Sequence, residues 1–126
     1  MTSKKCYCGS SESFESCCGI YISGAQQAPT ALALMKSRYS AYVLHEADYI
    51  FETTHSSERK YYSREEIMHW ALANKWQKLE IISATENTVE FKAYFTNGIN
   101  ANQVHHEFST FIQENGKWFY VDGTFK

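Results

Sequence analysis

The chain has 126 residues, of which 44% are hydrophobic and 16% are aromatic, and its net charge is −2 at pH 7. This length suits one ordinary core with a small appendage and excludes two large domains, and the aromatic content excludes a disordered chain. The slightly negative charge provides no basic field for nucleic acid or anionic lipid, so we expect no direct nucleic-acid partner.

The sequence carries no signature of export or membrane insertion. Residues 1–5 are charged, but no apolar run of signal-peptide length follows them. No stretch approaches the roughly 20 apolar residues that span a bilayer. We therefore predict a cytoplasmic protein without a membrane span, in a compartment that keeps thiols reduced.

All four cysteines lie in the first 18 residues, as Cys6, Cys8, Cys17 and Cys18. One short loop can then supply four thiolates to a single ion, and tetrahedral sulfur ligation suits Zn²⁺. The adjacent pair can bind the same ion if it opens a helical turn, where successive side chains diverge by roughly 100°. We predict a zinc knuckle at residues 1–19, closed to substrate if all four cysteines bind. Two disulfides, four free thiols or a redox-active pair are the alternatives.

After the knuckle, residues 20–27 are predicted to be a linker broken at Gly24, and residues 28–126 to form one domain. Pro29 and Thr30 are typical of a helix start. The apolar residues that follow recur at helical spacing and predict one buried stripe, made of Leu32, Met35, Tyr39, Tyr42 and Val43.

Two shorter helices are predicted next. One includes residues 49–51 and follows a bend near residues 45–48. The other begins at Ser63, which resembles a capping box with Glu66, after a polar loop at residues 55–60. Its predicted buried side consists of Ile67, Trp70 and Ala71.

The apolar period then changes to two, which is typical of half-buried strands. Strands are predicted at 76–84, 89–95, 103–114 and 117–121, with turns at Asn97–Gly98–Asn100 and at Asn115–Gly116. Helices followed by an antiparallel meander predict an α+β fold, in which the helices pack on one face of a curved antiparallel sheet.

The cysteine segment resembles a known motif. Cys6-Tyr7-Cys8-Gly9-Ser10 followed by Cys17-Cys18-Gly19 is similar to SEC-C, the zinc knuckle in the C-terminal tail of the SecA translocation ATPase. The family pattern is Cys-Pro-Cys-Gly-Ser-Gly, a basic stretch, and then Cys-Cys or Cys-His. Its ligand spacing is retained here, so the resemblance implies zinc.

The basic stretch is not retained. Tyr7 replaces the proline of the pattern, and other residues stand where glycine, lysine and tyrosine are usual, namely Ser11, Glu12, Phe14 and Glu15. The resemblance therefore does not extend to binding an acidic chaperone such as SecB.

Nearly the whole chain resembles the YchJ family. The matching segments are Ala28-Pro29-Thr30, Leu34-Met35-Lys36-Ser37-Arg38-Tyr39-Ser40-Ala41-Tyr42, Asp48-Tyr49, Trp76, His106-Glu107, Ser109, Phe111 and Trp118-Phe119-Tyr120-Val121-Asp122-Gly123. That family is similar to cone-shaped domains of the nuclear-transport-factor-2-like (NTF2-like) and cystatin-like type. The resemblance implies this fold and no particular activity. Many members carry a second knuckle after the Val-Asp-Gly segment. Residues 124–126 do not provide one, so we expect no function that needs two.

Five domain residues are candidate contacts of a ligand pocket: Arg38, Tyr42, Asp48, Glu107 and Trp118. A buried arginine needs a partner, for which Asp48 or Glu107 is suitable. Aromatic side chains that could line the pocket, or simply fill the core, are Tyr39, Tyr42, Trp70, Phe91, Trp118 and Tyr120.

Neighbouring residues of one strand point to opposite faces, so His106 and Glu107 cannot both point inward. If Glu107, Ser109 and Phe111 face the core, Glu107 is the best candidate for a raised pKa. If Val104, Phe108 and Ile112 face it, His106 takes that place. His105 shares a face with Glu107 and is expected to be solvated. We expect structural roles for these groups and assign no catalytic residue.

These features favour two functions, and the lack of a basic surface disfavours a third, direct nucleic-acid binding by the knuckle. The first is a non-enzymatic adaptor whose zinc knuckle docks to a protein or ribosomal partner. The alternative is a small-molecule-binding protein or cone-fold enzyme, with a pocket near Glu107 and His106 and one of these residues as general base.

Overall fold

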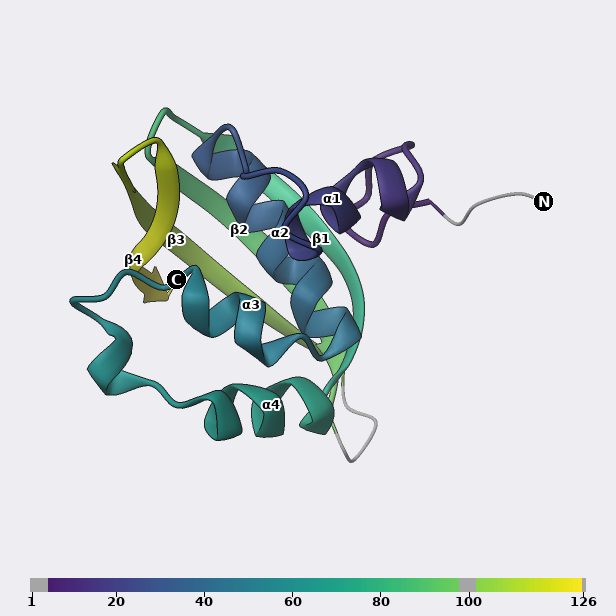
Figure 1. Cartoon of the computed structure of the whole chain (residues 1–126). Helices are drawn as coiled ribbons and strands as arrows, with labels where there is room; N and C mark the ends of the chain where they lie inside the picture. Colours follow the sequence, from purple (N-terminus) through teal and green to yellow (C-terminus); the bar gives the residue numbers. More distant parts are fainter. Residues whose placement is uncertain (1–4, 98–101, 126) are drawn as a thin grey trace.

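The computed structural model describes residues 5–97 and 102–125, with the helices first and the strands after them (Figure 1). The helical elements are η1 (Phe14–Ser16), α1 (Cys18–Ile22), α2 (Ala31–Leu44), α3 (Ala47–Glu52), η2 (Arg59–Tyr61) and α4 (Arg64–Ala73). The strands are β1 (Lys75–Ala84), β2 (Thr88–Thr96), β3 (Asn102–Glu114) and β4 (Lys117–Phe125). The predicted α+β class is confirmed. Among the described residues, no helix is long and apolar enough to cross a membrane.

Helix α2 begins and ends at residues suited to those positions. Thr30 precedes it, and its side-chain oxygen accepts a hydrogen bond of 3.0 Å from the backbone N–H of Ala33. The helix ends where His45 takes the left-handed conformation, with φ of 62°. Of the predicted stripe, Met35 and Tyr39 are buried, whereas Leu32, Tyr42 and Val43 are half-buried. The buried face instead includes polar side chains, namely Ser37, Arg38 and Ser40. These three side chains need partners inside the molecule.

Helices α3 and α4 enclose a small apolar cluster of Ala41, Ala47, Ile50 and Ile67. Ser63 caps α4 as predicted, because its Oγ accepts from the backbone N–H of Glu66. The carboxylate of Glu66 accepts a hydrogen bond from the same hydroxyl, in place of the Ser63 backbone N–H of a full capping box. The prediction that Trp70 is buried is wrong, since 44% of this residue is exposed. It packs edge-on against Trp76 and Phe95 at the rim of the sheet and leaves its other side in solvent.

The strands form an antiparallel meander in the order β1-β2-β3-β4. Strand β3 decides the open choice of faces: Glu107, Ser109 and Phe111 are buried, whereas Val104 and Ile112 are exposed. The alternation predicted for β2 is confirmed by its four buried residues, Val89, Phe91, Ala93 and Phe95.

The turns and strand ends differ only in detail from the predictions. Asn115 and Gly116 both have positive φ, as a tight hairpin between β3 and β4 requires. Strand β4 continues beyond the predicted residue 121, because residues 122–125 stay paired with β3. The predicted turn near Asn97 falls on residues 98–101, outside the described part of the chain.

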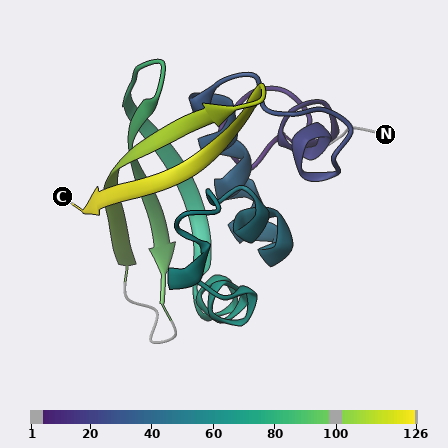
Figure 2. The same ribbon diagram turned by 60° about the vertical axis from the view of Figure 1, so that its left-hand side comes forward.

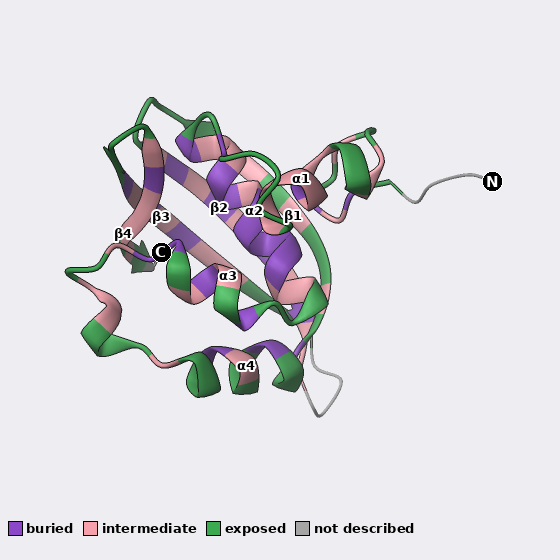
Figure 3. Ribbon diagram, viewed as in Figure 1, coloured by how far each residue is buried: buried purple, intermediate pink, exposed green. Residues whose placement is uncertain are grey.

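The helices gather on one side of the twisted sheet (Figure 2). The main core lies between α2 and the inward face of the strands, and its buried members are Ala28, Ala31, Leu34, Met35, Tyr39, Val89, Phe91, Ala93, Phe111 and Trp118. Figure 3 shows buried positions along α2 and on the strands behind it, with exposed positions on the outer side of α4. A hydrophobic layer between helix and sheet therefore holds the domain together.

The N-terminal segment packs on this domain beside α2 and β1 (Figure 1). Cys6 Sγ lies 3.7 Å from Ser40 Oγ of α2, and Leu79 of β1 packs against the cysteines. Helix α1 extends to Ile22, so the first three residues of the predicted linker 20–27 are helical, and the chain turns at Gly24 with φ of 87°. The division into a knuckle at 1–19, a linker and a domain at 28–126 stays a prediction.

Candidate functional site

The cysteine segment is a small loop closed by backbone hydrogen bonds. The N–H of Cys6 donates to the carbonyl of Glu12 at 2.8 Å, and the N–H of Gly9 donates to the carbonyl of Cys6 at 3.2 Å. Gly9 has φ of 96°, a conformation that favours glycine, so the turn after Cys8 depends on this residue. Cys17 then precedes α1 and Cys18 opens it, which is the arrangement that allows neighbouring cysteines to converge.

The four sulfur atoms all lie within 4.8 Å of one another. A tetrahedral site with Zn–S bonds of about 2.3 Å needs sulfur atoms roughly 3.8 Å apart. The Sγ atoms of Cys8 and Cys17 are 3.7 Å apart, close to that spacing. Cys6, Cys8 and Cys18 are buried and Cys17 is half-buried. These four thiols therefore fit a tetrahedral metal ion, and together they could hold one.

Hydrogen bonds to the sulfur atoms support the same chemistry. Ser10 Oγ donates to Cys17 Sγ at 3.3 Å, and Ser40 of α2 lies beside Cys6. Such donors stabilise thiolate character and orient metal-binding sulfur atoms. The link to Ser40 also ties the knuckle to the central helix of the domain.

The thiols differ in their tendency to ionise. A hydrogen bond from Cys18 outweighs burial and lowers the pKa of Cys8 to about 4. The hydrogen bond to Cys8, followed by burial, raises the pKa of Cys18, and burial raises the pKa of Cys17. One thiolate thus disfavours the next unless a cation offsets the charge, which is why clustered cysteines suit divalent metal ions.

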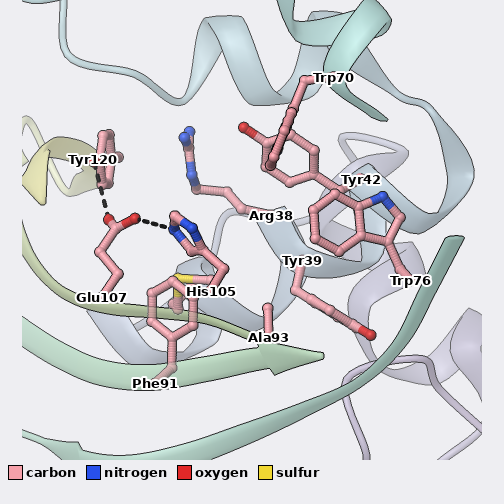
Figure 4. A pocket seen from close by; sticks show the side chains of 11 residues that line it. Arg38, Tyr39, Tyr42, Trp70, Trp76, Phe91, Ala93, His105, Glu107 and Tyr120 are labelled. Atoms are coloured by element: carbon pink, nitrogen blue, oxygen red, sulfur yellow. Dashed lines mark hydrogen bonds and ion pairs between the residues drawn. The ribbon is translucent and has the colours of Figure 1, made fainter. Parts of the chain in front are cut away.

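A second feature is a cavity of about 390 Å³ between α2, α4 and the sheet (Figure 4). Its lining residues are Met35, Arg38, Tyr39, Tyr42, Trp70, Trp76, Phe91, Ala93, His105, Glu107 and Tyr120. The volume lies within the range of about 300–1,000 Å³ that is usual for small-molecule sites. Most of the wall is aromatic, and the polar groups of Arg38, His105 and Glu107 lie toward one end in Figure 4.

Glu107 accepts hydrogen bonds from three side chains. His105 Nε2 lies 2.7 Å from Oε1, whereas Ser109 and Tyr120 donate to Oε2 at 2.6 and 3.1 Å. Gly123 of β4 leaves room for this carboxylate, because a Cβ atom there would overlap it. Burial raises the pKa of Glu107, but the three hydrogen bonds outweigh burial and hold the pKa below its usual value. The expected raised pKa is therefore wrong, and Glu107 is an ionised, well-satisfied group.

Arg38 has different partners from those predicted. Its Nη1 donates to the carbonyl of Ile50 at 2.8 Å and to the hydroxyls of Thr53 and Thr54 at 2.7 and 3.4 Å. The guanidinium also lies over the ring of Tyr120, 4.6 Å from its centroid. Within the described residues it forms no ion pair. The prediction of Asp48 or Glu107 as its partner is wrong, because the end of α3 satisfies Nη1 with neutral oxygen atoms.

Comparison with known proteins identifies the family. Residues 30–123 match the family model described as the middle NTF2-like domain of YchJ. The chain belongs to the YchJ family. It is 36% identical over 125 residues to a UPF0225 protein of Geobacter sulfurreducens, across 94% of this chain and 77% of that protein. A UPF0225 protein of an Enterobacter species is 39% identical, across 94% of this chain and 82% of the relative.

Solved structures of two proteins described as containing a SEC-C motif share the fold. The solution structure of one from Rhodopseudomonas palustris has a TM-score of 0.87 and 35% identity, covering 94% of this chain and 96% of that chain. The crystal structure of one from Psychrobacter arcticus has a TM-score of 0.81 and 30% identity, covering 100% of this chain and 84% of that chain. The predicted resemblances to the YchJ, NTF2-like and SEC-C families are confirmed.

The structure brings together three of the five candidate pocket residues of this YchJ-family chain. Arg38, Tyr42 and Glu107 line the cavity. Asp48 is exposed and pairs with Arg64 at 2.7 Å. Trp118 belongs to the core, and its indole N–H donates to the carbonyl of Pro29. Because Asp48 starts α3 on its solvent side and Trp118 packs beneath α2, neither side chain reaches the cavity. A ligand-binding role for any of the five stays a prediction.

The structure decides which histidine of β3 faces the cavity. His106 points away from the cavity and contacts Glu90 on the other face of the sheet, at 2.8 Å. His105, expected to be solvated, lines the cavity and pairs with Glu107. The sequence carried a signal for this pairing, since residues two apart on a strand share a face. Trp76 was missed as a lining residue, and no local pattern distinguishes it from a core tryptophan.

Proposed function

We propose that this chain is a zinc-binding adaptor, in which a closed four-cysteine knuckle docks to a protein partner and the NTF2-like domain supports it. The convergence of four sulfur atoms within 4.8 Å carries this proposal. Zinc is the metal of choice for four thiolates, because tetrahedral sulfur ligation matches its geometry and softness. A fully ligated ion has no free position for substrate, so the role we assign to it is structural.

The exposed side chains of the knuckle suggest the chemistry of its partner. Glu12 and Glu15 are both exposed, and Lys5 is the only exposed basic side chain among residues 5–22. With Lys4 and Lys5 the charges of residues 1–19 balance, so the knuckle provides no basic field for nucleic acid. The exposed carboxylates of Glu12 and Glu15 can each pair with a basic side chain of a protein. We therefore propose that the partner presents a basic protein surface, either as a free protein or on the ribosome.

Metal content and partner capture test the adaptor proposal together. We expect one zinc ion per chain by elemental mass spectrometry, and loss of zinc in Cys17→Ser but not in the control Ser11→Ala. The full chain should capture a defined basic protein, or co-sediment with purified ribosomes, through its knuckle. Cys17→Ser should abolish this capture while the domain stays folded.

A charge reversal separates docking from metal binding. The double variant Glu12→Lys, Glu15→Lys should retain zinc, because neither side chain contacts the sulfur atoms in the described structure, and should lose the partner. Capture that persists in the metal-free Cys17→Ser variant would overturn the adaptor role. Capture that persists after charge reversal would overturn the basic-partner assignment alone.

One observation favours a second candidate function, a small-molecule site in the domain. The cavity of about 390 Å³ combines an aromatic wall with Arg38, His105 and Glu107. These features are those of a ligand pocket, which is usually mostly apolar with a few convergent polar groups. Glu107 remains a candidate in this site, whereas His106 lies on the opposite face and cannot take part. Heteronuclear NMR of the zinc-loaded chain against a small-molecule library tests this function, and shifts confined to the cavity would support it.

A further inference from the structure

The guanidinium of Arg38 has unused hydrogen-bond donors inside the molecule. Arg38 is only 7% exposed, and all three of its hydrogen bonds leave from Nη1. No described residue accepts a hydrogen bond from its Nε or Nη2, and the side chain lines the cavity. A buried cation held only by neutral oxygen atoms and an aromatic ring favours an anion beside it. The cavity therefore presents a positive group that no carboxylate of the described residues contacts directly.

The negative group of the cavity, by contrast, is already satisfied. Both carboxylate oxygens of Glu107 accept hydrogen bonds, with His105 on one oxygen and Ser109 and Tyr120 on the other. A cationic ligand would have to displace or share these donors. The polar end of the cavity consequently offers hydrogen-bond donors to a ligand more readily than acceptors.

The hydroxyl of Tyr42 adds a second donor. Among the described residues it has no hydrogen-bond partner, and in Figure 4 it points toward the side on which the Arg38 guanidinium lies. An arginine with planar donors and a neighbouring phenol form a site for a planar oxyanion such as a carboxylate.

The remaining wall suits a flat apolar group. The rings of Tyr42 and Trp76 have centroids 5.5 Å apart, and those of Trp70 and Trp76 are 6.1 Å apart. Trp70 is 44% exposed and stands at the rim, where a ligand ring would cover it. Stacking and edge-to-face packing against such rings favour an aromatic ligand over an aliphatic one.

We propose that the cavity binds a small aromatic carboxylate, with its carboxylate on Arg38 and the Tyr42 hydroxyl and its ring against Trp70 and Trp76. This inference rests on the second candidate function above and is independent of the zinc knuckle. The donors determine the charge of the ligand, and the tryptophans determine its shape.

Three probes of nearly equal shape test the ligand class. The zinc-loaded full chain is titrated with 2-naphthoate, neutral 2-naphthamide and cationic 2-naphthylmethylamine. Binding is measured by isothermal titration calorimetry and by NMR chemical-shift changes. We expect 2-naphthoate to bind at least tenfold more tightly than the amide, and the amine to bind most weakly. Equal binding of acid and amide, or tighter binding of the amine, overturns the carboxylate class and leaves a small-molecule site. If none of the three probes binds, both the carboxylate class and the small-molecule site are overturned.

Variants assign the contacts. Trp70→Ala should weaken the binding of 2-naphthoate and of 2-naphthamide alike, by about tenfold, because it removes a ring that both ligands would contact. Ile112→Ala, on the opposite face of the sheet, should change neither. Arg38→Gln should abolish the preference for the acid, and a retained preference would overturn the role of Arg38.

Because Arg38 also holds the end of α3, the fold of Arg38→Gln must be checked by NMR. Tyr42→Phe keeps the ring and removes only the donor. It should reduce the preference for the acid severalfold, and an unchanged preference would remove Tyr42 from the site.

Discussion

The cysteine segment and the helix-and-sheet part of this chain bury different kinds of side chain. The buried apolar members of the knuckle are three of its own cysteines, with only partly buried side chains such as Phe14 and Ile22 around them. The domain instead has a continuous hydrophobic layer between α2 and the sheet. A segment as short as the knuckle buries too little apolar surface to offset its conformational entropy without a metal ion. We therefore predict that the knuckle needs a metal ion for order, whereas the domain folds by burial of apolar surface.

A similar contrast exists within the sheet itself. His105 and Glu107, both on β3, lie 2.7 Å apart, and His106 of β3 lies 2.8 Å from Glu90 of β2 on the other face of the sheet. Only the first pair has a buried carboxylate. A similar distance therefore does not imply a similar energy, because a hydrogen bond to a charged group contributes more where water is excluded.

Metal removal should produce the largest effect and separate the two regions. Structural zinc sites contribute an apparent binding free energy of about 10–16 kcal/mol at pH 7. We expect a strong chelator to abolish hydrogen-exchange protection in residues 5–22 while the amides of α2 and β2 remain protected. Added Zn²⁺ should restore the protection. Simultaneous loss of protection in both regions would contradict the proposed independence of the domain.

Truncation of the domain core should have the next largest effect. Phe111 is 2% exposed, so Phe111→Ala should lower the free energy of unfolding by about 3–5 kcal/mol, measured by urea denaturation. Its neighbour Ile112 points to solvent and provides a matched control, for which Ile112→Ala should cost less than about 1 kcal/mol. The loss of free energy of unfolding caused by Phe111→Ala should be the same with and without a chelator. A loss that depends on zinc would show that the two regions fold as one unit.

The two His–Glu pairs allow the smallest effect to be measured. Glu107→Gln should lower the free energy of unfolding at pH 7 by about 1.5–3 kcal/mol, because it removes the charge from three hydrogen bonds. Glu90→Gln should cost less than about 1 kcal/mol, because that pair is half-exposed.

The pH dependence provides a second readout of Glu107. Its pKa in the folded state is lower than the ordinary value of 4.5, so the unfolded chain binds a proton first as the pH falls. Stability from Glu107 is thus complete above about pH 4.5 and is lost as the pH falls through the folded-state pKa. The free energy of unfolding, measured by urea denaturation between pH 7 and pH 3, should decrease more steeply with falling pH for the wild type than for Glu107→Gln. An equal dependence on pH in both proteins would show that folding does not stabilise this carboxylate.

Sequence spacing alone was enough to predict the features that depend on neighbours along the chain. Four cysteines within one loop, the caps at Thr30 and Ser63, and the alternation of β2 are local patterns, and the structure contains each of them. The order of helices and strands predicted the α+β class for the same reason, because a meander with one apolar face can bury it only under the helices.

Tertiary structure decided which groups meet across the chain. The alternation of β3 left two faces equally possible, and only packing under α2 turned Glu107 inward and His106 outward. The hydrogen-bond partners of Arg38 lie at the end of α3, and no spacing in the sequence predicts them. The cavity is lined by residues of α2, α4 and all four strands, which lie far apart in the sequence. The sequence by itself therefore determined the knuckle and the fold class, whereas long-range packing determined the cavity and its charge.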